Sequence, residues 1–183
     1  MVFQTPRLVI RKAVPSDHDV ELYYALWSNP KVMTFVGFPE GLKMTREDIR
    51  NQLAGCNETE YDRLLIVELK DTNQPIGECK LGLPNSDDIA GTDVKLLPEF
   101  WRNGYGSEVK RGLVEYLLAH TDCKAIKATP NKLNIASQKM QESVGGKCVG
   151  EDTYHFPEKM RSYTVDLDLY IYHVSRTDYE RNK

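Results

Sequence analysis

The sequence predicts an α+β fold built around a mixed central sheet. Two observations predict it. Strand-like and helix-like segments alternate along the chain, and several strand-like segments come before the longest helical pattern. No repeat, low-complexity tract or linker divides the chain. Because 183 residues are enough to bury a substantial core, we expect a single domain over residues 1–183.

The first third of the chain predicts one strand and two helices. Residues 5–11 alternate as an opening strand. Ser16 caps a helix that ends before Pro30, and residues 45–48 have the spacing of a capping box that opens a second helix. Residues 32–42, between the two helices, mix glycine, proline and aromatic side chains. We interpret this segment as a loop and a candidate substrate lid.

The remaining two thirds predict six strands and two helices. The strands are expected at residues 64–70, 76–83, 89–97, 125–129, 147–154 and 162–172. One helix follows a glycine-containing loop and carries the apolar stripe Val109, Leu113, Tyr116 and Leu117. The other helix begins at Asn134.

Composition and charge narrow the class of protein. A formal net charge of -3 and a pI of about 5.8 argue against a nucleic-acid-binding protein, which needs a basic face. The four cysteines stand far apart in the sequence, so no paired metal site or redox dithiol is expected, and a reducing cytoplasm is favoured. The longest aliphatic run, residues 64–67, is too short to span a membrane, and no signal peptide is recognised.

The most informative segment is residues 99–108, EFWRNGYGSE. It places two glycines directly before an amphipathic helix, where unpaired backbone N–H groups and the helix dipole favour an anion. Gly104 and Gly106 are expected to allow positive φ and a close approach of phosphate oxygens. The N–H groups expected to bind a pyrophosphate are those of Arg102, Asn103, Gly104, Tyr105, Gly106 and Ser107, with the Arg102 guanidinium adding a charged contact.

Two familiar nucleotide motifs do not fit this segment. A Walker loop requires a Gly-Lys-Ser/Thr ending that the chain lacks. The dinucleotide fingerprint requires a third glycine where Val109 stands, and it belongs near the start of a βαβ unit. The segment LPEFWRNGYGSE instead resembles the coenzyme A loop of the GNAT N-acetyltransferases, in particular the ribosomal-protein alanine N-acetyltransferase branch, where a Trp commonly stands at the place of Trp101.

Three other segments resemble this family in the same order, so the resemblance covers roughly residues 5–180. They are residues 5–11, the Asn134 to Ser137 segment with Val144-Gly145, and residues 172–179. The resemblance implies acetyl-CoA as cosubstrate. It also implies a mostly antiparallel sheet with helices on both faces, whose fourth and fifth strands splay to admit the cofactor. Tyr105 is interpreted as a core anchor, and Lys110 as a solvated helix-surface residue rather than a phosphate ligand.

The Asn134 to Ser137 motif is expected to be the second cofactor element. By spacing alone, Asn134 is a helix cap and Ser137 a solvated residue. The resemblance implies instead that Asn134 contacts the cofactor and that Ser137 protonates the departing thiolate. The chain departs from the family at Gln141, where many members place a Tyr that acts as the acid. It departs again at Gly146, where a Phe is usual.

The implied chemistry is direct attack of an amine on a thioester. Backbone N–H groups near Leu96 and Leu97, freed by strand splaying, are expected to polarise the acetyl carbonyl. Asp93 and Glu78 are candidate general bases in neighbouring strands, although either carboxylate can equally face solvent. Deprotonating a lysine-like amine at pH 7 costs about 4.6 kcal/mol, whereas an N-terminal amine costs only about 1 to 1.4 kcal/mol.

Two functions remain open at this point. The first is an N-acetyltransferase acting on a primary amine, either a protein N-terminus or a small molecule such as an aminoglycoside or polyamine. The alternative is a catalytically degenerate acyl-CoA-binding sensor or scaffold, which the absence of the usual helix Tyr favours. A homodimer through the exposed edge of the C-terminal strands is also possible.

Overall fold

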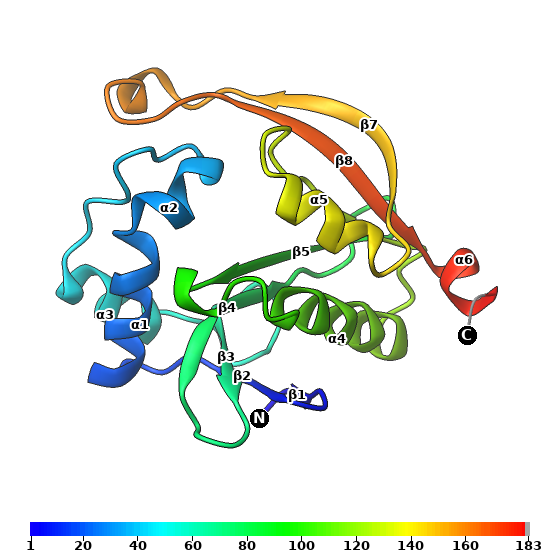
Figure 1. Cartoon of the computed structure of the whole chain (residues 1–183), viewed down its shortest axis with the longest axis horizontal. Coiled ribbons are helices and arrows are strands. Elements are labelled where there is room, and N and C mark those ends of the chain that lie inside the picture. Colours follow the sequence, from blue (N-terminus) through cyan, green and yellow to red (C-terminus); the bar gives the residue numbers. More distant parts are fainter. Residues whose placement is uncertain (182–183) are drawn as a thin grey trace.

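The computed structural model describes residues 1–181, which form one eight-stranded sheet with six α-helices around it (Figure 1). The order of the strands is β1-β2-β3-β4-β5-β6-β8-β7. Only the β5–β6 pair is parallel, and the other pairs are antiparallel. The predicted α+β class and the mostly antiparallel sheet are therefore confirmed.

The strands and helices lie close to their predicted positions. The strands are β1 (Phe3–Gln4), β2 (Leu8–Lys12), β3 (Leu65–Leu69), β4 (Pro75–Leu81), β5 (Ile89–Leu96), β6 (Ala125–Ala128), β7 (Lys147–Tyr154) and β8 (Leu167–Ser175). The helices are α1 (Asp17–Trp27), α2 (Pro30–Met33), α3 (Arg46–Ala54), α4 (Tyr105–His120), α5 (Ile135–Glu142) and α6 (Arg176–Arg181). Within residues 1–181, no helix has the length and apolar character needed to cross a membrane.

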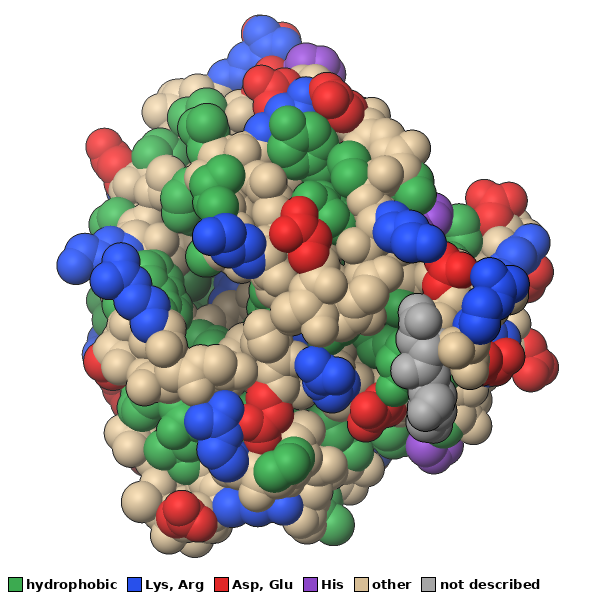
Figure 2. All heavy atoms as spheres, turned by 45° about the vertical axis from the view of Figure 1, so that its right-hand side comes forward, with side chains coloured by type: hydrophobic (Ala, Val, Ile, Leu, Met, Phe, Trp, Pro, Cys, Tyr) green, Lys and Arg blue, Asp and Glu red, His purple; other side chains and the backbone are tan. Residues whose placement is uncertain are grey.

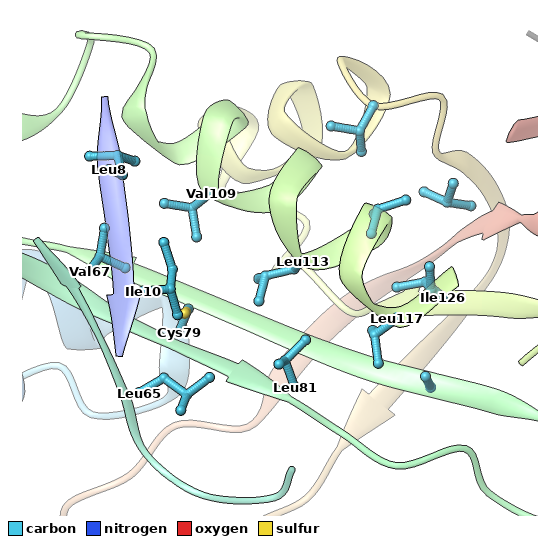
Figure 3. Close-up of a cluster of buried hydrophobic side chains, with 14 of the residues drawn as sticks. Leu8, Ile10, Leu65, Val67, Cys79, Leu81, Val109, Leu113, Leu117 and Ile126 are labelled. Atoms are coloured by element: carbon cyan, nitrogen blue, oxygen red, sulfur yellow. The ribbon is translucent and has the colours of Figure 1, made fainter. Parts of the chain in front are cut away.

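Two hydrophobic clusters cover the two faces of the sheet. Val109, Leu113 and Leu117 of α4 pack against one face, where they point toward strand residues such as Leu8 and Leu81 (Figure 3). The other face carries α1 and α3, whose buried side chains form a second cluster with Ile66. Side chains of a strand alternate between the faces, which is why Ile66 belongs to one cluster while its two neighbours belong to the other. Helices thus cover both faces, as predicted.

Local sequence signals account for the helix starts on the α1 face. The side chain of Ser16 accepts a hydrogen bond from Asp19 N–H at the start of α1. Thr45 and Asp48 form a complete capping box before α3. Both starts agree with the prediction. Between these helices, residues 30–36 form α2 and a 3-10 turn, so the segment predicted as a loop is partly helical.

The last strand begins later than predicted. β8 starts at Leu167 rather than at Ser162, because residues 158–160 form a 3-10 turn and Thr164 hydrogen-bonds back to the Met160 carbonyl. β7 and β8 form a long hairpin that arches over α5, with its tip beside α2 (Figure 1). The tip is attached by the Val165 N–H, which donates to the Gly37 carbonyl at 2.9 Å, and by the Phe38–Phe156 ring contact.

The sheet opens between β5 and β6. β5 pairs with β6 only over residues 89–91, and from Thr92 to Leu96 its outer edge has no strand partner among residues 1–181. In the sequence-based strand numbering, which omitted the short β1, these are strands four and five. The opening leaves backbone groups of β5 available on one edge, next to the start of α4.

Candidate active site

The glycine loop places the N-terminus of α4 next to the open edge of β5. Gly104 is the N-cap residue, has φ +79° and supplies no side-chain cap, while the Glu108 N–H already bonds the Gly104 carbonyl at 3.1 Å. The three amides between them, of Tyr105, Gly106 and Ser107, therefore precede the first intrahelical hydrogen bond. Unpaired amides at a helix N-terminus form an anion site.

The two glycines have different roles in this loop. Gly104 adopts the positive φ that was expected, and so does the non-glycine residue Arg102, at φ +63°. Gly106 does not have a positive φ, so the expectation for this residue was wrong. Its role is to leave space, because a Cβ at this position would lie 3.2 Å from Met140 Sδ on α5. Gly106 therefore keeps the start of α4 close to α5.

The opening segment of the chain holds the loop in place. Glu108 accepts hydrogen bonds from Thr5 Oγ1, Arg7 N–H and Arg7 Nε. The Arg7 guanidinium also donates to the Asn103 carbonyl at 3.0 Å and lies 4.4 Å from the centroid of the Tyr105 ring. Partial burial opposes the effect, but these hydrogen bonds hold the pKa of Glu108 below its ordinary value. Tyr105 packs against the core cluster of α4, in agreement with its interpretation as an anchor.

The second predicted cofactor element lies on α5, beside α4 (Figure 1). Asn134 is the N-cap of α5, and its Oδ1 accepts the Ser137 N–H at 3.1 Å. Ser137 is half-buried in the first turn. Gln141, at the place of the usual Tyr, is buried, and its carbonyl accepts the Gly146 N–H. A Cβ at Gly146 would lie 2.6 Å from that carbonyl, which explains why the family's Phe does not occur here.

The edge of β5 presents one of the two predicted backbone donors. The Leu97 N–H donates to the Ile76 carbonyl on β4 at 2.9 Å, so it is not free, contrary to the expectation. Successive N–H groups of a strand point to opposite edges. The Leu96 N–H therefore points to the open edge, on which the Leu96 carbonyl accepts the Trp101 indole N–H at 2.8 Å. The structure thus leaves Leu96, and not Leu97, as the available donor.

A pocket of about 290 Å³ lies on the opposite face of β5 from the glycine loop. The Leu96 side chain faces α4 and would lie 3.9 Å from a Cβ at Gly106, whereas Asp93 and Lys95 line the pocket. The segment between α1 and α3 supplies Met33, Val36, Phe38, Leu42 and Met44 to the wall. The predicted lid segment therefore does border a pocket. The hairpin tip contacts this segment through Phe156, and the residues that line the pocket do not include any from the tip.

Four charged side chains on β4 and β5 form the floor of this pocket. Glu78 lies opposite Lys95 and Lys80 opposite Asp93 in the strand register. Lys95 Nζ contacts both Asp93 and Glu78, the latter at 3.1 Å from Oε1. The Trp27 indole N–H also donates to Glu78 Oε1, at 3.0 Å. The structure thus brings together the two predicted carboxylates, with a lysine between them.

The charges in the floor fix the protonation of two of its members. Desolvation favours the neutral forms, but attraction to Asp93 and Glu78 raises the pKa of Lys95 above its ordinary value. Desolvation likewise opposes the effect at Asp93, where the Lys95 ammonium holds the pKa of the carboxyl below its ordinary value. Lys95 is therefore an ammonium and Asp93 a carboxylate near neutral pH.

Sequence reasoning missed Lys110, which is buried rather than solvated. Its Nζ donates to Thr92 Oγ1 at the point where β5 and β6 separate. Burial lowers the pKa of Lys110 from 10.5 to about 7, with the Asp93 charge opposing the shift. One signal was present in the sequence. Lys110 stands four residues after Gly106 and three before Leu113, and so shares the inward face of α4.

Comparison with known proteins agrees with this arrangement. Residues 7–147 match the family described as the acetyltransferase (GNAT) domain. The uncharacterized N-acetyltransferase YoaA of Bacillus subtilis (strain 168) is 29% identical over 147 residues, which are 79% of this chain and 81% of that protein.

Solved structures have the same fold. The acetyltransferase (GNAT family) from Bacillus anthracis superposes with a TM-score of 0.77 at 23% identity, covering 96% of this chain and 98% of that one. AAC(6')-Ib in complex with ribostamycin and coenzyme A superposes with a TM-score of 0.76 at 20% identity, covering 97% and 98%.

The chain therefore belongs to the GNAT acetyltransferase family. It is an N-acetyltransferase, and its acetyl donor is acetyl-CoA. The superfamily resemblance drawn from the glycine loop is confirmed. These comparisons do not confirm the ribosomal-protein alanine branch.

Proposed function

We propose that this protein transfers the acetyl group of acetyl-CoA directly to a small-molecule primary amine held in the pocket between β4, β5 and residues 33–44. One observation carries the proposal. The unpaired amides of α4 and the charged pocket lie on opposite faces of β5, and the free edge of β5 lies between them. A donor bound on one face and an acceptor bound on the other meet at that edge.

The cofactor is proposed to lie along the α4 face. The amides of Tyr105, Gly106 and Ser107 bind the pyrophosphate, together with the loop residues Arg102, Asn103 and Gly104. The Leu96 N–H donates to the acetyl carbonyl and stabilises the oxyanion that forms on attack. Asn134 keeps its side-chain amide nitrogen for the cofactor, because the cap uses only Oδ1.

Proton transfer is proposed to involve Glu78 and Ser137. Glu78 is the proposed base, because it is a buried carboxylate on the floor of the pocket. The proposed role of Asp93 is to hold the Lys95 side chain in place through their ion pair. The positive charge of Lys95 beside the pocket favours the neutral form of the incoming amine. Ser137 is the proposed donor of a proton to the departing thiolate, since Gln141 has no acidic proton to give.

A small molecule is favoured over a protein N-terminus as acceptor. The Gly37–Val165 hydrogen bond and the Phe38–Phe156 contact join the pocket wall to the hairpin tip. A peptide would require an open path for the chain that follows its first residue. The solved neighbour AAC(6')-Ib holds ribostamycin, a small molecule, which supports the same choice. The ribosomal-protein branch, a homodimer through the exposed strand β7 and a cytoplasmic location stay predictions of the sequence.

The proposal is tested by the release of free coenzyme A from acetyl-CoA with a panel of small amines and one short peptide. We expect release with small amines and a kcat about 100-fold lower in Glu78→Gln. Asp93→Asn should lower kcat by less than Glu78→Gln does. Binding of acetyl-CoA without release of coenzyme A across the panel would contradict the proposal and favour the sensor alternative. Faster turnover of the peptide would instead contradict the small-molecule acceptor.

A further inference from the structure

The walls of the acceptor pocket are apolar. They are formed by the side chains Trp27, Met33, Val36, Phe38, Leu42, Met44 and Leu64, with Gln52 as the polar exception outside the floor. A hydroxyl group placed against such a wall without a partner costs about 1–3 kcal/mol. A substrate covered with hydroxyls therefore fits this wall poorly, and an apolar body fits it well.

The floor carries no net charge. Glu78 and Asp93 contribute two negative charges and both contact Lys95, while Lys80 contributes a second positive charge and pairs with Asp62 outside the floor, at 3.6 Å. Each carboxylate lies opposite a lysine in the strand register, and Lys95 contacts both of them. A polycation gains affinity from carboxylates that lack a cationic partner. Among the residues that line this pocket, both carboxylates are already paired.

Two acidic side chains on the elements that supply the pocket wall, Glu21 and Glu40, are each paired with a basic side chain. Glu40 lies within 3.5 Å of Lys43, and Glu21 is paired with Arg46. Figure 2 brings forward the side of the molecule that carries α4 and α6, and acidic and basic side chains are interspersed on that face. Long-range steering of a multiply charged substrate requires a surface of one sign.

The pocket is small for a ligand site. Its volume of about 290 Å³ lies just below the usual range of small-molecule pockets, which runs from about 300 to 1,000 Å³. A cavity of about 150 Å³ holds benzene. There is therefore room for one aromatic ring with a short side chain.

From these features we propose that the acceptor is a primary amine with a single cationic nitrogen and an apolar body of about the size of one aromatic ring. This inference rests on the proposed function and names the substrate class of the same site. The amine nitrogen lies at the Glu78–Lys95 end of the floor, and the apolar body contacts Phe38, Leu42 and Met44. Polyamines and aminoglycosides are poor substrates.

The first test compares kcat/KM for 2-phenylethylamine, spermidine and ribostamycin by release of coenzyme A. We expect kcat/KM for 2-phenylethylamine to be at least about tenfold higher than for either polycation, a difference of about 1.4 kcal/mol. An equal or higher value for a polycation would overturn the substrate class and leave the proposed function standing. Acetyl-CoA binding with no turnover of any amine would overturn both. Failure to bind acetyl-CoA would overturn the proposed function, and with it the substrate class that rests on it.

The second test places a charge in the wall. Met44→Glu adds an unpaired carboxylate to the pocket, and Val14→Glu adds the same group at an exposed position that does not line it. We expect Met44→Glu to lower kcat/KM for 2-phenylethylamine at least about tenfold and to raise the ratio of spermidine to 2-phenylethylamine turnover. Val14→Glu should change neither. Leu42→Glu replaces Met44→Glu if thermal melting shows that variant to be unfolded. An unchanged ratio in the folded variant would overturn the proposal.

Discussion

The indole N–H of Trp27 donates to Oε1 of Glu78 across 3.0 Å, joining the helical wall of the pocket to its charged floor. Both residues are buried, with 7% of the surface of Trp27 and 4% of that of Glu78 exposed. The same carboxylate oxygen contacts Lys95. A buried carboxylate that loses a hydrogen-bond donor is penalised by its desolvation. This contact therefore fixes the position of the proposed base.

Trp27→Phe tests that relationship. The variant keeps an aromatic ring and removes the donor, so we expect the free energy of unfolding to fall by about 1–3 kcal/mol in urea denaturation. A double-mutant cycle with Glu78→Gln separates this contact from the loss of packing. A coupling of about 1 kcal/mol or more is expected between the two positions. Additive effects of the two substitutions would show that the hydrogen bond contributes nothing.

Glu108 predicts a dependence of stability on acidic pH. Its pKa is held below the ordinary value of 4.5 in the folded protein, so its hydrogen bonds stabilise the fold above pH 4.5. That contribution is lost as the pH falls through the lower, folded value. Glu108→Gln should therefore lower the free energy of unfolding at pH 7 by about 1–2 kcal/mol, and the difference should shrink below pH 4.5.

Urea denaturation at several pH values between 3 and 7 measures this effect. Glu99→Gln is the matched control, because Glu99 is exposed and makes no side-chain hydrogen bond or ion pair within the described part of the chain. The control should follow the wild-type curve. A constant difference between Glu108→Gln and wild type across this range would contradict the role assigned to Glu108.

Lys110 predicts a second dependence of stability on pH, at neutral to alkaline values. Burial lowers its pKa from 10.5 to about 7, so the unfolded chain binds this proton more tightly than the folded protein. The free energy of unfolding should therefore rise with pH between about 7 and 10.5. Lys110→Met removes the cost of burying the charge and should be more stable than wild type at pH 7, by roughly 4 kcal/mol.

The advantage of Lys110→Met should largely disappear above about pH 10.5, where the lysine is mostly neutral in both the folded and the unfolded state. Lys139→Met, at an exposed position on α5, serves as the control and should run parallel to wild type. Loss of stability in Lys110→Met at pH 7, with no pH trend in the wild type, would show that the buried lysine is not destabilising.

Features set by neighbouring residues could be predicted from the sequence. The capping residues Ser16 and Thr45 act within three positions of their partners, so their spacing alone located α1 and α3. The two glycines and the helix after them likewise identified the start of α4. Such signals depend on local backbone geometry, which the order of the residues determines directly.

Features set by strand register and distant packing could not be predicted. Leu96 and Leu97 differ only in the edge of β5 to which their N–H groups point, and pairing with Ile76 on β4 decides this. Lys110 was assigned to the surface because lysines are rarely buried, and only the packing of α4 on the sheet shows otherwise. The acceptor pocket forms where β4, β5 and residues 33–44 come together. No local pattern in the sequence indicates that these segments are neighbours in the fold.

The central claim is that the first amides of α4 bind the pyrophosphate of acetyl-CoA in the space that Gly106 leaves beside Met140. Calorimetric titration of acetyl-CoA into wild type, Gly106→Val and Gly55→Ala tests it most directly, since Gly55 lies at the distant end of α3 and a Cβ there meets no atom closer than 3.5 Å. We predict tight binding to wild type and Gly55→Ala and a Kd at least about 100-fold weaker in folded Gly106→Val. An unchanged affinity in Gly106→Val would contradict the account.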